Sequence, residues 1–369
     1  MSKKNDKTKQ NNTQQKNNNI KQILLYFILS RVLLIIFLLL KKQEIVELFD
    51  SVHYISIAKY GYSEPFLYAF FPMYPVLIKV LTYIIPSYEI SGLLISNVCS
   101  FLSVIILNKL TKNNFWNITT FIFTPILAYT SIIYTESVFM LFTLYGYYLY
   151  KNNKYLLSGI IIGLSMLTRN SGIILWGAIG LDMLYRLFIT KDKTIRFKHI
   201  IKFGLPSLVI GLIYSLYLYF ETGNMFEYIT VQSEYWNRLT GTMFHGFIND
   251  IKFLKSLKEG LFINLIPFLE NWIFFILTFI LGIKIFKKDK VSSIYIILSL
   301  ITITTSYRDI TRWGTISTIS LFRYILNLFP IYLYLYDTKK ESTIKLIFLI
   351  MTLLSVFNAT LIYSGAFLG

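Results

Sequence analysis

The chain has 369 residues, of which 55% are hydrophobic, 17% aromatic and only 15% charged. Soluble domains carry roughly 25% charged residues, and a water-soluble fold could not bury this much apolar surface. The net charge of +17 would suggest a nucleic-acid partner in a soluble protein, but here the Lys and Arg residues form short clusters between apolar runs. Because this arrangement is typical of membrane-protein loops, we predict an all-α polytopic membrane protein and no nucleic-acid partner.

The N-terminal segment, residues 1–22, is rich in Lys and Asn and poor in apolar residues. This composition predicts a disordered basic tail in the cytosol. The apolar run Ile23–Leu40 that follows resembles a signal peptide, but it is long enough to span a membrane and no small-residue cleavage site follows it. We therefore interpret it as a retained first span and predict one transmembrane domain over residues 23–369.

Further apolar runs predict additional spans, with loose boundaries because several runs are shorter than the ~20 residues that a span needs. The predicted spans are 90–108, 117–133, 135–150, 155–168, 171–189, 200–220, 261–283, 291–306, 316–336 and 343–363.

The run Pro72–Pro86 could be a short span or a helix lying at the membrane interface. If it does not cross, five basic clusters share a side with the basic N-terminus, as the positive-inside rule requires. These clusters are Lys109/Lys112, Lys151/Lys154, Arg186–Lys198, Lys284–Lys290 and Lys339–Lys345. We therefore predict an interfacial helix, about eleven spans, a cytosolic N-terminus and a C-terminus on the far side.

The far side then receives two long loops, 41–88 and 221–260, and three short turns that carry charges next to apolar runs. A charge in such a place costs a few kcal/mol unless it is paired or faces water, so these groups are candidates for function. Asp50 lies just beyond the first span among aromatic residues. It could be a general base or, alternatively, an ordinary solvated loop residue.

Several stretches together carry a resemblance. They are FDSVHYISIAKYGY (49–62), YAFFPMYPVLI (68–78), YTESVFMLFTLYGYYLY (134–150), GLSMLTRNSGI (163–173) and FRYILNLFPIYLY (322–334). In this order and spacing, over residues 23 to 336, the chain resembles the GPI mannosyltransferase 2 (PIG-V) family, which adds the second mannose of the glycosylphosphatidylinositol core. The family usually has Trp where this chain has Phe49, so an indole donor is missing here.

The resemblance implies a GT-C type fold with lumenal interfacial helices and an active site in the endoplasmic reticulum membrane. The implied donor is dolichyl-phosphate-mannose, and the implied acceptor is a GPI-precursor glycolipid that receives an α-1,6-linked mannose. Further implied partners are membrane lipids and a small membrane subunit, and no cofactor is implied.

This chemistry needs one base, because the acceptor hydroxyl must lose a proton while the lipid phosphate leaves already ionised. Asp50 is the expected base of this inverting reaction, and Arg side chains suit the phosphate through their bidentate geometry. The expected substrate-binding residues are His53, Glu136, Arg169, Asn170, Arg308, Arg312 and Arg323.

Most of these residues also have a structural alternative, whereas the position of Arg323 inside an apolar run favours a function. Arg308 and Arg312 flank Asp309 and could form a surface ion pair, Arg169 and Asn170 could cap a helix, and Glu136 could begin one. His53 could be a partner of Asp50 or an interfacial aromatic residue. His199 and His245 have no ligand spacing with Cys or carboxylates, so no metal site is predicted.

Two other functions remain open at this point. A prokaryotic enzyme of the same family would use a polyprenyl-phosphate sugar, with its active site outside the cytoplasm. A secondary transporter or lipid scramblase would share the composition, although we find no internal repeat and the charges gather at one face rather than at mid-membrane.

Overall fold

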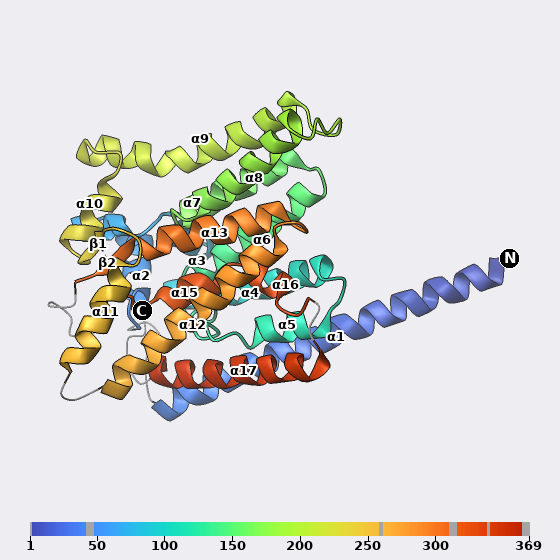
Figure 1. Cartoon of the computed structure of the whole chain (residues 1–369), viewed down its shortest axis with the longest axis horizontal. Coiled ribbons are helices and arrows are strands. Elements are labelled where there is room, and N and C mark those ends of the chain that lie inside the picture. Colours follow the sequence, from blue (N-terminus) through green and yellow to red (C-terminus); the bar gives the residue numbers. More distant parts are fainter. Residues whose placement is uncertain (1, 42–47, 258–260, 310–315, 338–339, 364–369) are drawn as a thin grey trace.

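The computed structural model describes residues 2–41, 48–257, 261–309, 316–337 and 340–363 of the chain, and most of them are helical. In chain order the elements are α1 (Ser2–Lys41), α2 (Ser51–Tyr60), the 3₁₀ helix η2 (Pro65–Ala69), α3 (Met73–Thr82), α4 (Tyr88–Leu110), α5 (Phe115–Ile122), α6 (Glu136–Lys151), α7 (Tyr155–Thr168), α8 (Gly172–Phe188), α9 (Phe197–Thr222), α10 (Glu227–Glu234), β1 (Arg238–Thr240), α11 (His245–Ser256), α12 (Leu261–Ile285), α13 (Lys290–Thr304), β2 (Ser306–Arg308), α15 (Leu321–Leu326), α16 (Pro330–Tyr334) and α17 (Glu341–Tyr363). The strands and the short helices α2, α10 and α11 gather at one end of the molecule, and the N-terminus projects from the other (Figure 1).

Five helices in the described part of the chain are long and apolar enough to cross a membrane. They are Ile20–Leu40 within α1, Tyr88–Leu110 (α4), Phe197–Thr222 (α9), Asn264–Ile285 within α12 and Glu341–Tyr363 (α17). They coincide with five predicted spans and make the chain a multi-pass membrane protein. The total of about eleven spans stays a prediction.

Shorter helices, α6, α7, α8 and α13, occupy the positions of four other predicted spans. Small residues let these helices pack closely: a Cβ added at Gly159 in α7 would lie 2.2 Å from the backbone oxygen of Phe203 in α9. Helix association in a membrane depends on such packing, because lipid tails are as apolar as the helix surfaces.

Two predicted spans, 117–133 and 316–336, are not continuous helices in the structure, and whether they cross the membrane stays a prediction. α5 ends at Ile122 and is followed by a buried non-helical segment containing Pro125, and the second region contains only the short helices α15 and α16, separated before Pro330. Proline lacks a backbone N–H and disfavours helix at the preceding residue. Hydrophobicity alone could not show these breaks.

Side chains from neighbouring helices satisfy backbone groups that the breaks leave free. Asn271 of α12 donates to the Thr318 carbonyl oxygen at 2.9 Å and accepts the Phe322 N–H at 2.8 Å. Asn117 of α5 donates to the Leu333 carbonyl oxygen at 3.2 Å. Such replacements are required because irregular backbone is tolerated at membrane depth only where its polar groups find partners.

The two long loops, 41–88 and 221–260, contain mainly short helices and strands. α3 has 10 residues, fewer than a span needs, and the interfacial position of 72–86 stays a prediction. The 221–260 loop forms the short helices α10 and α11 and also contributes β1, which pairs with β2 in an antiparallel ladder that the sequence did not predict.

In the structure α1 begins at Ser2 and continues into the first span, while the disorder of the tail stays a prediction. The segment contains no Gly or Pro, so no residue in it ends a helix before the span. This part of α1 projects away from the other helices (Figure 1).

The topology predicted from the charge rule leads to a labelling experiment. In a Cys99→Ser background, a cysteine at the exposed position Ser63 should react with an impermeant maleimide only from the lumenal side, and one at Lys193 only from the cytosolic side. The two positions lie in connections that the charge rule assigns to opposite sides. Labelling of both positions from the same side would contradict the predicted topology.

Candidate active site

A fully buried carboxylate, Glu136, lies at the centre of the candidate site. It occupies the first turn of α6, where the helix dipole favours a negative charge. Its Oε1 atom is 2.6 Å from Nη1 of Arg169 and 3.3 Å from Nε of Arg323. Arg169 follows α7 and Arg323 lies in α15, so one carboxylate joins three segments that are distant in sequence. Such a buried charge is tolerable only because it is paired.

Tyr324 brings a further arginine to this cluster. Its hydroxyl accepts a hydrogen bond from Nη1 of Arg238 at 2.9 Å and another from Nη2 of Arg323 at 3.3 Å. The guanidinium of Arg169 lies 5.0 Å from the centroid of the same ring. Three arginines therefore surround one phenol ring.

The β1–β2 ladder adds the fourth arginine. Its register places Arg238 directly opposite Arg308. Burial, together with the positive charge of Arg238, lowers the pKa of Arg308. Like charges opposite each other destabilise a ladder, and the negative charge of Asp50 opposes this effect at Arg308.

Asp50 belongs to the first long loop, 41–88, and lies near the arginine cluster. It is the N-cap residue of α2, it is half-buried, and its backbone N–H donates to the Tyr134 hydroxyl at 3.0 Å. The negative charge of Asp50 acts on Arg308 and opposes the lowering of its pKa. Tyr134 is two residues before Glu136, so one turn holds both carboxylates in place. The arrangement puts a carboxylate at the edge of a strongly cationic site.

Non-glycine residues with left-handed backbone occur just before three of the site elements. They are Phe49 (φ 49°) before Asp50, Asn237 (φ 52°) before Arg238 and Ser320 (φ 82°) before α15. This conformation is unfavourable for L-residues and especially for a bulky one such as Phe49. Backbone strain of this kind persists where the surroundings enforce it, most often at functional sites.

His53 lies in an aromatic cluster beside Asp50. Its ring centroid is 5.0 Å from that of Phe70, 5.2 Å from Trp236 and 5.6 Å from Phe66. Burial lowers the pKa of His53, although the charge of Asp50 opposes the shift. The imidazole is therefore neutral at neutral pH, and its ring packs as an aromatic residue.

The expected site residues have different outcomes. Glu136, Arg169, Arg308 and Arg323 come together with Asp50 at their edge, whereas Asn170 is exposed in the turn between α7 and α8. Arg312 lies outside the described residues. Within the described residues, no group of three or more His, Cys, Asp or Glu could hold a metal ion.

Sequence reasoning did not select Arg238 as a site residue. The available signal was its isolation, because no other Lys or Arg occurs between Lys202 and Lys252. The other basic side chains of the far-side loop 221–260, Lys252, Lys255 and Lys258, all lie in its last nine residues, so Arg238 is separated from them.

The structure predicts different effects for the two carboxylates. Glu136→Gln leaves two buried guanidiniums without their counterion, so it should lower the free energy of unfolding by about 3–5 kcal/mol. Asp50→Asn should change it little, because Asp50 is half-buried and its backbone contact to Tyr134 remains. Thermal unfolding in detergent measures both. Equal stability of Glu136→Gln and wild type would contradict a central role for Glu136.

A comparison with known families covers much of this site. Residues 39–238, more than half of the chain, match the family model described as mannosyltransferase (PIG-V). The match contains Asp50, Glu136 and Arg169 and ends at Arg238, whereas Arg323 lies beyond it. No curated protein matches the chain. The chain thus belongs to the mannosyltransferase (PIG-V) family, as its motifs predicted.

Proposed function

We propose that this multi-pass membrane mannosyltransferase transfers the second, α-1,6-linked mannose from dolichyl-phosphate-mannose to a GPI-anchor precursor glycolipid, with inversion at the anomeric carbon. The reaction takes place at the lumenal face of the endoplasmic reticulum membrane. The observation that carries this proposal is the half-buried Asp50 beside the cluster of Arg169, Arg238, Arg308 and Arg323.

Asp50 acts as the general base. The acceptor hydroxyl oxygen forms a bond to the anomeric carbon of mannose as the bond from that carbon to the phosphate oxygen breaks. The hydroxyl proton goes to the Asp50 carboxylate, and the phosphate leaves with the bonding electron pair. A positioned base typically contributes ~10² to 10⁴-fold to such a step.

The arginine cluster binds the donor phosphate and stabilises the charge that it gains on leaving. Arg238 and Arg308 are the primary phosphate ligands in this proposal, because they face each other across the ladder and both are partly accessible. Arg323 and Arg169 are held by Glu136 and act mainly as the inner wall of the site. The reaction needs no metal or cofactor in this scheme.

The first test concerns the reaction itself. Microsomes from cells that lack the second mannosyl transfer, supplied with this protein, should transfer mannose from dolichyl-phosphate-mannose to the one-mannose glycolipid. A parallel assay with a fully unsaturated polyprenyl-phosphate-mannose tests the prokaryotic alternative. Persistence of the one-mannose glycolipid despite good expression would refute the proposed reaction.

The second test separates base from phosphate ligand. Asp50→Asn should lower kcat by at least roughly 100-fold with little change in donor KM, because the proton acceptor is lost. Arg238→Gln should mainly raise the donor KM, because it removes a phosphate ligand. Glu64→Gln, which neutralises an exposed carboxylate in the same loop, is the matched control and should behave as wild type. Near wild-type turnover of Asp50→Asn would eliminate Asp50 as the base.

A further inference from the structure

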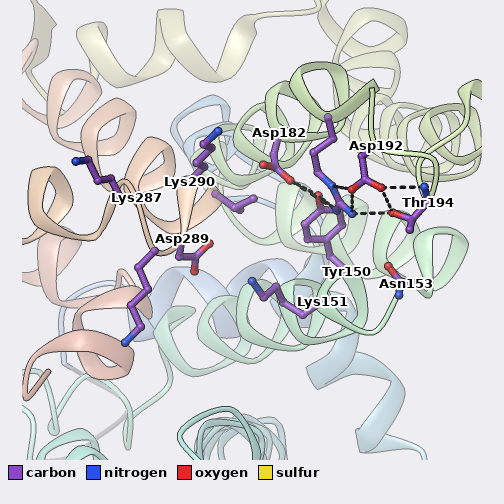
Figure 2. Close-up of a pocket in the computed structure, with 12 residues that line it drawn as sticks. Tyr150, Lys151, Asn153, Asp182, Asp192, Thr194, Lys287, Asp289 and Lys290 are labelled. Atoms are coloured by element: carbon purple, nitrogen blue, oxygen red, sulfur yellow. Dashed lines mark hydrogen bonds and ion pairs between the residues drawn. The ribbon is translucent and has the colours of Figure 1, made fainter. Parts of the chain in front are cut away.

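A cavity of about 560 Å³ opens at the C-terminal end of α6 (Figure 2). It lies between the ends of α6 and α8 and the connection from α12 to α13. α6 begins at Glu136 in the candidate active site and ends at Lys151 in this cavity, so the two sites are separated by ~20 Å of helix. The charge rule assigns this end to the cytosol.

Cationic side chains from three elements line the cavity. They are Lys151, Arg186, Lys287, Lys288 and Lys290. Three of their ammonium groups lie over aromatic rings: Lys290 is 3.5 Å from the Tyr185 centroid, Lys288 is 5.1 Å from that of Tyr334, and Lys151 is 5.7 Å from that of Tyr147. Lys288 also pairs with Asp337. A cation–π contact holds an ammonium group in place without using its N–H donors on a carboxylate.

The carboxylates of the cavity already accept hydrogen bonds from the protein. Asp289 is buried and accepts the hydroxyls of Tyr147, Ser292 and Tyr334. Asp182 accepts the Tyr150 hydroxyl.

The third carboxylate is also engaged. Asp192 lies 2.8 Å from Nη2 of Arg186 and accepts hydrogen bonds from Thr194. These acids therefore order the walls of the cavity and leave it with an excess of positive charge.

A second cavity of about 510 Å³ adjoins the first and shares Asn153 and Thr194 with it. It adds Lys154 and Lys202, and it is bounded by Leu156 and Leu157, each about half exposed at 48% and 49%. Across both cavities, seven Lys and Arg side chains stand against three carboxylates. A cationic pocket thus continues into an apolar surface.

We propose that the two cavities bind the headgroup of an anionic phospholipid, with its phosphate among Lys151, Lys287 and Lys290 and its acyl chains along Leu156 and Leu157. Basic pockets between helices at the cytosolic surface attract such headgroups. The apolar wall distinguishes a lipid from free phosphate, which would gain nothing from contact with leucine. This site is independent of the proposed mannosyl transfer and does not share its residues.

Native mass spectrometry of the full chain, released from phosphatidylcholine nanodiscs containing increasing phosphatidic acid, tests the proposal. Wild type should retain phosphatidic acid. The double variant Lys287→Gln/Lys290→Gln should bind phosphatidic acid roughly 30-fold more weakly, since each lysine near an anionic headgroup contributes about a factor of five. The single variants give the same test with a smaller effect if the double variant does not fold.

The matched control is Lys109→Gln/Lys112→Gln, which removes the same charge at the same end of the molecule but outside both cavities. It should retain phosphatidic acid as wild type does. Equal affinity in the cavity variant and wild type, or equal loss in both double variants, would overturn the proposal. A third arm adds inorganic phosphate to pure phosphatidylcholine nanodiscs. If inorganic phosphate raises the unfolding temperature of the protein as much as phosphatidic acid does, the cavity binds free phosphate and the lipid proposal is rejected.

Discussion

The ion pairs of Glu136 with Arg169 and Arg323 are the constraint on which the rest of the site depends. A carboxylate this deeply buried is stable only with its partners, so α6, the turn after α7 and α15 must meet at one point. That meeting brings Tyr324 close to Arg169, and Tyr324 in turn holds Arg238 of β1. The ladder then places Arg308 beside Arg238. A cluster of like charges is thus assembled around one internal anion, and in the proposed reaction its outer arginines bind the donor phosphate.

The breaks in two predicted spans follow from the same requirement. A continuous helix over 316–336 would present Arg323 and Tyr324 on a regular surface, whereas the short α15, entered through left-handed Ser320, directs both into the cluster. The break deprives backbone N–H and C=O groups of their helical hydrogen-bond partners, which is unfavourable at membrane depth. Asn271 compensates by donating to the Thr318 carbonyl oxygen and accepting from the Phe322 N–H. Asp250 contributes similarly from the far-side loop, where it accepts from the Ser317 N–H and the Thr318 hydroxyl. Residues that do not contact substrate, such as Asn271 and Asp250, therefore also hold the site in position.

Sequence alone predicted the membrane class, the five long spans and the common side of Asp50, Glu136, Arg169 and Arg323, because hydrophobicity and charge asymmetry are local properties. It did not predict the interrupted helices, because the spans were assigned from hydrophobicity, which does not change at a break, whereas Pro125 and Pro330 mark the breaks in the sequence. It also could not assign Glu136 its role: a carboxylate at a helix start could bind substrate or only begin the helix, and the structure shows it buried between two guanidiniums. Arg238 was missed because strand pairing between residues 238 and 308 is a long-range contact without a local signal.

The most direct test of the central claim is an experimental structure of the Asp50→Asn variant with dolichyl-phosphate-mannose bound. The account predicts that the donor phosphate lies within hydrogen-bond distance of Arg238 and Arg308, with the anomeric carbon turned toward position 50 and Glu136 still paired with Arg169 and Arg323. A phosphate bound away from these arginines, or a mannose ring placed beyond the reach of position 50, would contradict it.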